Sequence, residues 1–149
     1  MAGVRICLYK RSIAMAPTGI AASHIGGYTL HSVLDIPGEH QHSERPLKPF
    51  NDLKLQMARK LFNNVVLVVI DEMSMLSPAF LAQIDARLRI VSKHDVPFGG
   101  YKVLLMGDFY QLPPVCCSTT LYEAASRKTD VSNRTRKKRR QHPHECCNE

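Results

Sequence analysis

Two uninterrupted apolar runs mark the centre of this 149-residue chain, at residues 65–70 and 103–106. Runs without polar alternation are typical of strands that are covered on both faces in parallel α/β sheets. Between the two runs, Ser77 and Pro78 have the residue types of a helix cap and a first helical position. This helix returns the chain to the sheet, and because such crossovers are right-handed, we expect the two strands to be parallel neighbours. Its predicted apolar face consists of Phe80, Leu81, Ile84, Leu88 and Val91.

The pattern predicts further elements before the first run. Residues 12–16 form a short strand, after which Thr18 can cap a helix that ends at Gly26. Thr29 can begin a short helical turn over residues 30–34. Residues 50–62 show helical spacing and end at Asn63, which predicts a packing helix. The face expected to pack is made of Phe50, Leu53, Met57 and Leu61.

Acidic residues follow both apolar runs: Asp71 and Glu72 follow the first, and Asp108 follows the second. Ligands of open α/β sheets bind at the carboxyl ends of the strands, where these residues are expected. One carboxylate can bind Mg²⁺, and a second can orient or deprotonate a water that attacks a phosphoryl group. Asp71 suits the metal role and Glu72 the water role. The same pair can also be a solvated strand end or a charge pair at a helix N-terminus.

The net charge of +7 is concentrated at the C-terminal end. Residues 127–149 hold eight of the 20 Lys and Arg and three of the 13 acids, so they carry +5. Such a tail is predicted to be disordered and to bind polyanions with little sequence preference. Its basic run fits a nucleic-acid patch or a nuclear-localisation signal, with a solvated charge run as the alternative. The run contains Arg134, Arg136, Lys137, Lys138, Arg139 and Arg140.

The remaining composition narrows the class of protein. The length predicts one domain, over residues 12–126, between an N-terminal segment of unclear role at 1–11 and the tail at 127–149. No apolar run approaches the length of a membrane span. Five cysteines without a C-x-x-C motif do not form a disulfide framework, which favours a reducing compartment. We expect the nucleus; the acid-free N-terminal segment is a weak mitochondrial signal.

Four segments resemble successive motifs of one family. IDEMSM (70–75), PFGG (97–100) and GDFYQLPPV (107–115) are similar in order and spacing to motifs of the petite-integration-frequency (PIF) helicases, superfamily-one DNA helicases with RecA-like motor domains. Upstream, APTGIAASHIGGYTLHS (16–32) resembles the single-strand-binding motif of that family. The resemblance implies an α/β fold: part of a RecA-like P-loop NTPase domain, three-layered, with a mainly parallel sheet.

By this resemblance the chain is a fragment of an ATP- and Mg²⁺-dependent DNA helicase. Activity from 5′ to 3′ is implied, in DNA repair, recombination or telomere maintenance, or in a rolling-circle transposon. Asp71 is then the magnesium ligand and Glu72 the catalytic-water carboxylate. Gln111 senses the terminal phosphate and couples it to DNA movement, and Asp108 helps to position it. The implied contacts with single-stranded DNA are Thr18, Gly19, His31 and Ser32.

Without the resemblance, residues 16–32 fit an ordinary strand-to-helix turn with His31 as a core residue. The phosphate loop G-x-x-x-x-G-K-[ST] is missing, since no Gly-Lys dipeptide occurs. In the family this loop lies upstream and a second motor domain follows. We therefore expect a fragment that is inactive alone, with residues 103–106 as an exposed apolar strand. The alternative is a non-catalytic nucleic-acid-binding protein that uses the Thr18 turn and the basic tail.

Overall fold

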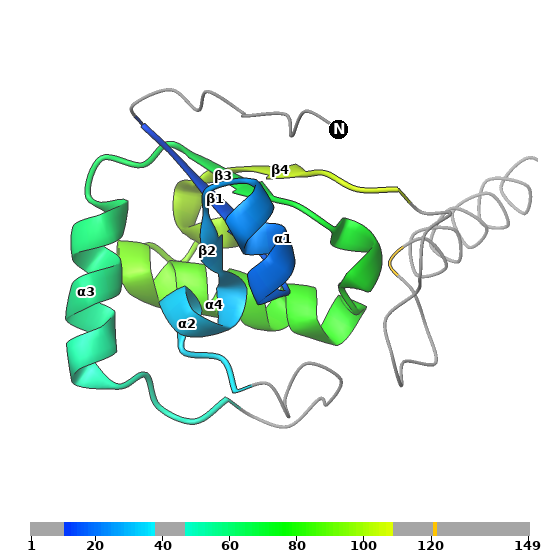
Figure 1. Cartoon of the computed structure of the whole chain (residues 1–149). Helices are drawn as coiled ribbons and strands as arrows, with labels where there is room; N and C mark the ends of the chain where they lie inside the picture. Colours follow the sequence, from blue (N-terminus) through cyan, green and yellow to red (C-terminus); the bar gives the residue numbers. More distant parts are fainter. Residues whose placement is uncertain (1–10, 38–46, 109–120, 122–149) are drawn as a thin grey trace, which may run out of the picture.

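A four-stranded parallel sheet forms the centre of the protein (Figure 1). The computed structural model describes residues 11–37, 47–108 and 121. The strands are β1 (Ser12–Ala16), β2 (Tyr28–Thr29), β3 (Leu67–Ile70) and β4 (Lys102–Leu105), in the order β2-β1-β3-β4. Ile70 of β3 pairs with Met15 of β1 and with Leu105 of β4. The predicted α/β class is confirmed, and the two apolar runs are parallel neighbours as expected.

The strands differ from the predicted runs mainly at their ends. β3 begins at Leu67, two residues later than the predicted run. The Val66 amide, just before the strand, donates to the Arg11 carbonyl at 2.7 Å. β4 lies one residue earlier than predicted. β2 was not predicted at all, and its two residues pair with Met15 and Ala16 at the end of β1.

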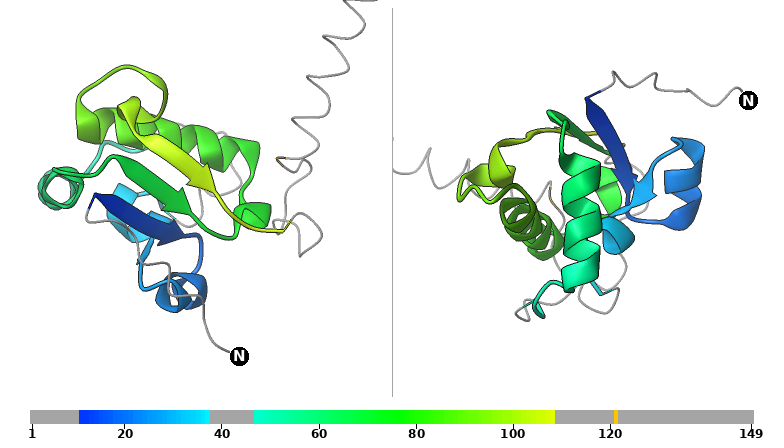
Figure 2. Two further views of the ribbon diagram at one scale, coloured as in Figure 1. Left: turned by 90° about the horizontal axis from the view of Figure 1, so that it is seen from above. Right: turned by 90° about the vertical axis from the view of Figure 1, so that its left-hand side faces the viewer.

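Among the residues that the structure describes, four helices and two 3-10 turns connect the strands. They are α1 (Gly19–His24), α2 (Leu30–Leu34), α3 (Asp52–Phe62), η2 (Met73–Met75), α4 (Pro78–Ser92) and η3 (Pro97–Gly100). Figures 1 and 2 show α2, α3 and α4 gathered beneath the sheet, whereas α1 joins β1 to β2 and packs beside these two strands. The residues that fill the core between sheet and helices are apolar, among them Ile13, Met15, Val68, Ile70, Leu34, Phe62, Phe80 and Ile84.

Each of the four helices begins at a side-chain cap. The predicted caps Thr18, Thr29 and Ser77 each accept a hydrogen bond from the amide three residues further on, at 3.2, 3.3 and 3.0 Å. Asn51 caps α3, accepting from two amides of its first turn at 3.1 and 3.2 Å. These bonds satisfy amides that would otherwise lack a partner at the helix ends.

The buried face of α3 is only partly the predicted one, since Phe50 and Leu61 are partly buried against the core. Leu53 and Met57 are 71% and 69% exposed, whereas Ala58 and Phe62 are buried and Leu55 is partly buried. The helix carries two apolar stripes, and its contacts with α2 and α4 bury the stripe that contains Phe62. The prediction that α3 packs through Leu53 and Met57 is therefore wrong.

The predicted apolar face of α4 is buried, with Leu81 only partly so, and it includes an arginine. Arg87 is 1% exposed. Its Nη2 donates to the carbonyls of Asp35 and Lys48 at 3.0 and 2.9 Å, and its guanidinium lies over the Phe50 ring at 4.6 Å. Arg87 therefore ties α4 to the chain on both sides of the segment that separates α2 from α3.

The PFGG segment turns the chain from α4 into β4. Gly99 is buried with a φ of +62°, and a Cβ there would lie 2.5 Å from the Leu88 carbonyl oxygen. Asp85 of α4 accepts a hydrogen bond from the Phe98 amide. Glycine is needed here because a side chain would collide with α4 as well as strain the backbone.

β4 is the last strand on its side of the described sheet. Leu104 is 47% exposed and Lys102 is exposed, so the predicted exposed apolar edge is confirmed within residues 11–37 and 47–108. An edge of this kind offers unpaired backbone groups and apolar surface to other chains. None of the helices that the structure describes combines the length and the hydropathy of a membrane span.

Candidate active site

The Asp71–Glu72 turn lies at the carboxyl edge of the sheet, directly after β3. The Asp71 amide donates to the Met15 carbonyl at 2.9 Å, which fixes the start of the turn against the end of β1. Glu72 has left-handed backbone, with φ of 56° and ψ of 45°, and leads into η2. Both side chains are half-buried. A glutamate in this backbone region is uncommon, and such residues gather at functional turns.

The end of β4 is bonded to both sides of this turn. The Met106 amide donates to the Ile70 carbonyl before the turn, and the Met106 carbonyl accepts from the Met73 amide after it, both at 2.8 Å. At Gly107 a Cβ would lie 2.8 Å from the Met73 nitrogen, so this close approach requires glycine. Asp108 follows at once and is exposed.

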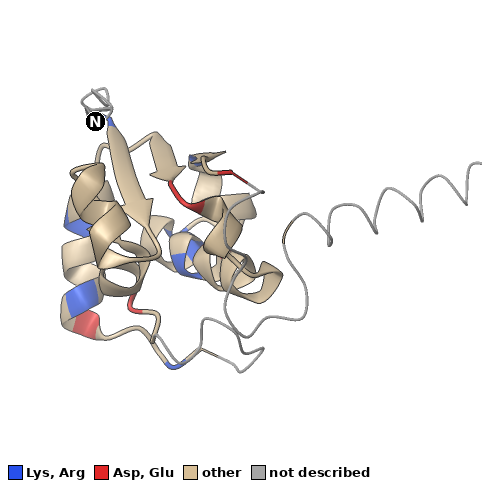
Figure 3. Cartoon of the chain, turned by 45° about the vertical axis from the view of Figure 1, so that its right-hand side comes forward, with Lys and Arg blue, Asp and Glu red and all other residues tan. Residues whose placement is uncertain are grey.

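The two predicted acidic groups therefore meet at one edge of the sheet. Figure 3 shows the acidic segments after β3 and after β4 next to each other at the ends of these strands. Parallel neighbours bring their carboxyl ends together, and the bonds of Met106 hold them there. The geometry matches the expectation from sequence that the two acidic ends lie on one edge of one sheet, where ligands of open α/β sheets bind.

The acidic edge supplies oxygen ligands of the kind that Mg²⁺ accepts. In the part of the chain that the structure describes, no group of three or more His, Cys, Asp or Glu is arranged to enclose a metal ion. Mg²⁺ in phosphate-transfer sites is commonly held by one or two carboxylates together with substrate phosphates and water. Asp71 fits such an open site, and it does not fit a site built from protein ligands alone.

The turn after β1 carries the first two residues predicted to contact DNA. The Thr18 hydroxyl accepts from the Ala21 amide at 3.2 Å and is thus occupied as the cap of α1. Gly19 is exposed, and nothing lies within 4 Å of the place that a Cβ would take. Another backbone can therefore approach this turn closely at Gly19.

The other two residues lie on α2 and point in different directions. Ser32 is exposed, and its hydroxyl is bonded to the hydroxyl and carbonyl of Thr29, at 2.8 and 2.9 Å. The His31 ring turns inward and stacks on Phe80 of α4, with ring centroids 5.1 Å apart and planes at 24°. Its Nε2 is buried without a hydrogen-bond partner among the described residues. Burial lowers the pKa of His31, and a hydrogen bond to the Pro17 carbonyl partly offsets this, so the ring is neutral at pH 7.

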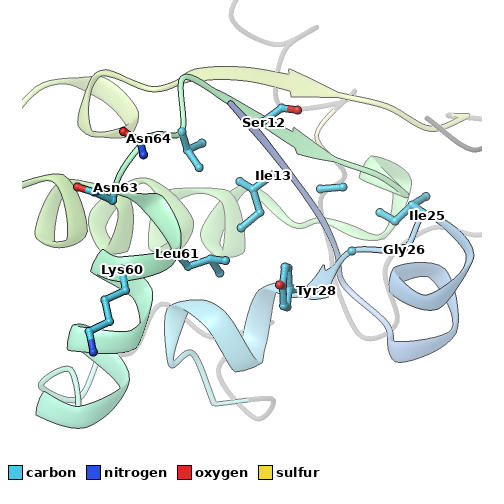
Figure 4. A pocket seen from close by; sticks show the side chains of 12 residues that line it. Ser12, Ile13, Ile25, Gly26, Tyr28, Lys60, Leu61, Asn63 and Asn64 are labelled. Carbon is cyan, nitrogen blue, oxygen red and sulfur yellow. The ribbon is translucent and has the colours of Figure 1, made fainter. Parts of the chain in front are cut away.

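A cavity of about 470 Å³ lies at the opposite edge, around the amino end of β1 (Figure 4). It is bordered by Ser12, by Gly26 and Tyr28, and by the end of α3 at Lys60 and Asn63. The cavity is therefore separate from the acidic edge.

Several predictions fall outside the described residues. They include Gln111, the predicted phosphate sensor, the N-terminal segment at 1–10, and the tail at 127–149 with its basic run. They remain predictions.

A family model described as PIF1-like helicase matches residues 6–135. The chain belongs to this family. Among curated proteins it is 38% identical over 106 residues to the ATP-dependent DNA helicase PIF1 of Xenopus laevis, and 39% identical over 107 residues to the ATP-dependent DNA helicase RRM3 of Saccharomyces cerevisiae. Each alignment covers 71% of this chain but only 16% and 14% of the relative.

Solved PIF1-like structures share the fold. Pif1 helicase from Bacteroides in complex with ADP-AlF3 and ssDNA matches with a TM-score of 0.60 at 38% identity, over 83% of this chain and 27% of that one. Pif1 helicase from Candida albicans matches with a TM-score of 0.54 at 31% identity, over 70% of this chain and 23% of that one. The RecA-like assignment is thus confirmed, and this chain spans about a quarter of the solved PIF1-like helicases.

The burial of Arg87 was missed from sequence. Arg87 lies seven residues after Phe80 on the apolar stripe of α4, and that position is the signal that could have revealed its burial. The inward direction of His31 agrees with the interpretation from the residues alone, in which His31 is a core residue.

Proposed function

We propose that this segment supplies the acidic half of a nucleotide site, and a surface for single-stranded DNA, in the first motor domain of an ATP-dependent DNA helicase. The observation that carries the proposal is the meeting of Asp71, Glu72 and Asp108 at the carboxyl edge of two parallel strands. The names of the relatives support it, as does the Bacteroides Pif1 complex with ADP-AlF3 and ssDNA. Unwinding from 5′ to 3′, and a role in DNA repair, recombination or telomere maintenance, belong to the same proposal.

ATP is the proposed substrate, and each acidic residue has a different role at its terminal phosphate. Asp71 holds Mg²⁺, which when bound neutralises charge on the phosphate oxygens. Glu72 orients the attacking water and takes its proton. Gln111 senses the terminal phosphate, and Asp108 helps to position it.

The DNA surface is proposed to run over the turn after β1 and the exposed side of α2. Gly19 leaves room for a strand backbone to approach, and Ser32 offers an exposed hydroxyl. Thr18 sets the direction of the turn through its cap bond. His31 lies on the same helix, but its ring is turned inward, away from this surface.

A chimera tests the catalytic proposal. Residues 12–126 replace the matching segment of Bacteroides Pif1, and ATP hydrolysis is measured with and without single-stranded DNA. The chimera is expected to be stimulated by DNA, and Glu72→Gln to lower kcat by about 10²-fold or more, because a general base contributes about 10²–10⁴. Asp95→Asn is the matched control, since the Asp95 side chain is 95% exposed and lies in the connection between α4 and β4. Equal rates for Glu72→Gln and Asp95→Asn would contradict the proposal.

The 149-residue chain alone is expected to bind single-stranded DNA without hydrolysing ATP. Three missing charge-assisted hydrogen bonds from a phosphate loop would weaken nucleotide binding by roughly 5–9 kcal/mol. Phosphate release that depends on DNA and disappears in Glu72→Gln would overturn this expectation. DNA binding that survives Ser32→Ala but is lost when residues 127–149 are removed would instead support a non-catalytic binder.

A further inference from the structure

His31 lies where the segments proposed to bind DNA and nucleotide come into contact. Its ring stacks on Phe80, which is fully buried in the first turn of α4. Its other ring nitrogen donates to the carbonyl of Pro17, in the turn that precedes Thr18. One side chain thus contacts both the turn after β1 and the helix that follows the acidic turn.

The path from Phe80 back to Glu72 is short and firmly held. The Met75 amide donates to the Glu72 carbonyl, and the Leu76 amide to the Met73 carbonyl, both at 3.0 Å. Leu76 is fully buried, and the cap of α4 holds the Phe80 amide at 3.0 Å. A shift of the acidic turn therefore moves the start of α4, because these hydrogen bonds and the burial of Leu76 hold the residues between them.

A second contact ties α2 to α4 at its other end. Asp35 is the last cap of α2 and has left-handed backbone, and Arg87 binds its carbonyl at 3.0 Å. Phe80 and Arg87 lie about two turns apart on α4, so α2 is held at both ends. Two separated contacts prevent α2 from pivoting on α4, and the helices should move together.

Resting on the proposed function, we propose that His31 is a positioning residue that couples the DNA-binding segment to the Asp71–Glu72 turn through Phe80 and Pro17. The ring itself does not contact DNA. Ser32, its neighbour on the exposed side of the same helix, makes the contact instead. A strand that binds over α2 then biases the acidic turn through α4.

The test combines DNA affinity with amide hydrogen exchange on the 149-residue chain. Fluorescence anisotropy measures the binding of a labelled oligo-dT, and exchange is followed at Asp71, Met75, Leu76 and Phe80. In the wild type, saturation with oligo-dT is expected to slow exchange at these amides by about threefold or more, in the range of measured couplings. His31→Ala is expected to bind oligo-dT with nearly wild-type affinity and to lose this DNA-dependent slowing.

Two further variants separate coupling from simple packing. His31→Phe keeps the stack on Phe80 and is expected to restore part of the slowing. Ser32→Ala is the matched control, expected to weaken oligo-dT binding but to show the full slowing once saturated. A purely structural role for His31 would raise exchange equally with and without DNA and leave the DNA-dependent difference intact.

Three outcomes would overturn the coupling. If the wild type binds oligo-dT without slower exchange at these amides, the coupling is refuted and the proposed DNA surface is retained. Loss of affinity in His31→Ala, with full slowing at saturation, would make His31 a DNA contact. No oligo-dT binding by the wild type would refute the DNA surface and the coupling together.

Discussion

Replacing Arg87 by alanine is the perturbation whose effect on stability can be worked out most directly. The substitution removes a guanidinium that is 1% exposed, two hydrogen bonds to the carbonyls of Asp35 and Lys48, and the contact with the Phe50 ring. Bonds from a charged donor contribute about 1.5–3 kcal/mol each, and the ring contact about 0.5–1 kcal/mol. The guanidinium lost hydration on burial, which offsets part of this sum, so the expected net loss is about 3–4 kcal/mol.

Urea denaturation followed by circular dichroism measures this loss. At a slope near 1.5 kcal/mol per molar urea, the midpoint of Arg87→Ala should fall by about 2–3 M. Since small domains have total stabilities of about 5–15 kcal/mol, the variant should lose a large fraction of the total. Arg89→Ala is the matched control on the same helix: its partners Asp85 and Asp95, at 2.9 and 2.8 Å, form surface ion pairs, and its midpoint should stay near wild type.

Arg87→Met separates packing from hydrogen bonding, because methionine fills much of the space but leaves the two carbonyls without their donor. We expect a midpoint between those of wild type and Arg87→Ala. A midpoint of Arg87→Ala equal to that of Arg89→Ala would refute the assigned role. Wild-type stability in Arg87→Met would show that the two carbonyl bonds contribute nothing.

Three further predictions use the same denaturation assay. Gly99→Ala should lose stability because its Cβ would meet atoms of α4 at 2.4 and 2.5 Å, whereas Gly19→Ala, with open space around it, should not; equal midpoints would exclude the steric argument. Phe62→Ala should lose about 3–5 kcal/mol and Met57→Lys less than about 0.5 kcal/mol, and the reverse order would restore the packing face predicted from sequence. Burial lowers the pKa of His31 in the folded state below the ordinary value of 6.5, so the unfolded chain binds a proton more readily as the pH drops from 7 towards 5, and stability should fall over this range. His31→Phe should flatten this profile; an unchanged slope in the variant would exclude His31 as the cause.

The sequence was informative where several local signals agreed. The cap at Ser77, the proline after it and the apolar spacing of α4 all predict one helix, and that helix dictates that β3 and β4 are parallel neighbours. Once the strands are neighbours, the acids after them must share an edge. The prediction of the acidic edge therefore depended on chain connectivity and required no knowledge of side-chain contacts.

Other features depended on contacts between distant segments. α3 carries one stripe through Leu53 and Met57 and another through Ala58 and Phe62, and only the positions of α2 and α4 decide which is buried. β2 has two residues, too few to show any period. The position of Arg87 on the apolar stripe of α4 indicates that it is buried, but spacing does not reveal that the carbonyls of Asp35 and Lys48 accept its hydrogen bonds.

The backbone of Met106 has a mechanical consequence for the acidic turn. It is bonded to Ile70 before the turn and to Met73 after it, so the turn is clamped on both sides by one residue of the neighbouring strand. Asp71 and Glu72 should therefore move together with the end of β4. A pull on the chain beyond Asp108, along the strand, therefore loads both bonds of Met106 together. Any motion that separates the acidic turn from the end of β4 must break these two hydrogen bonds.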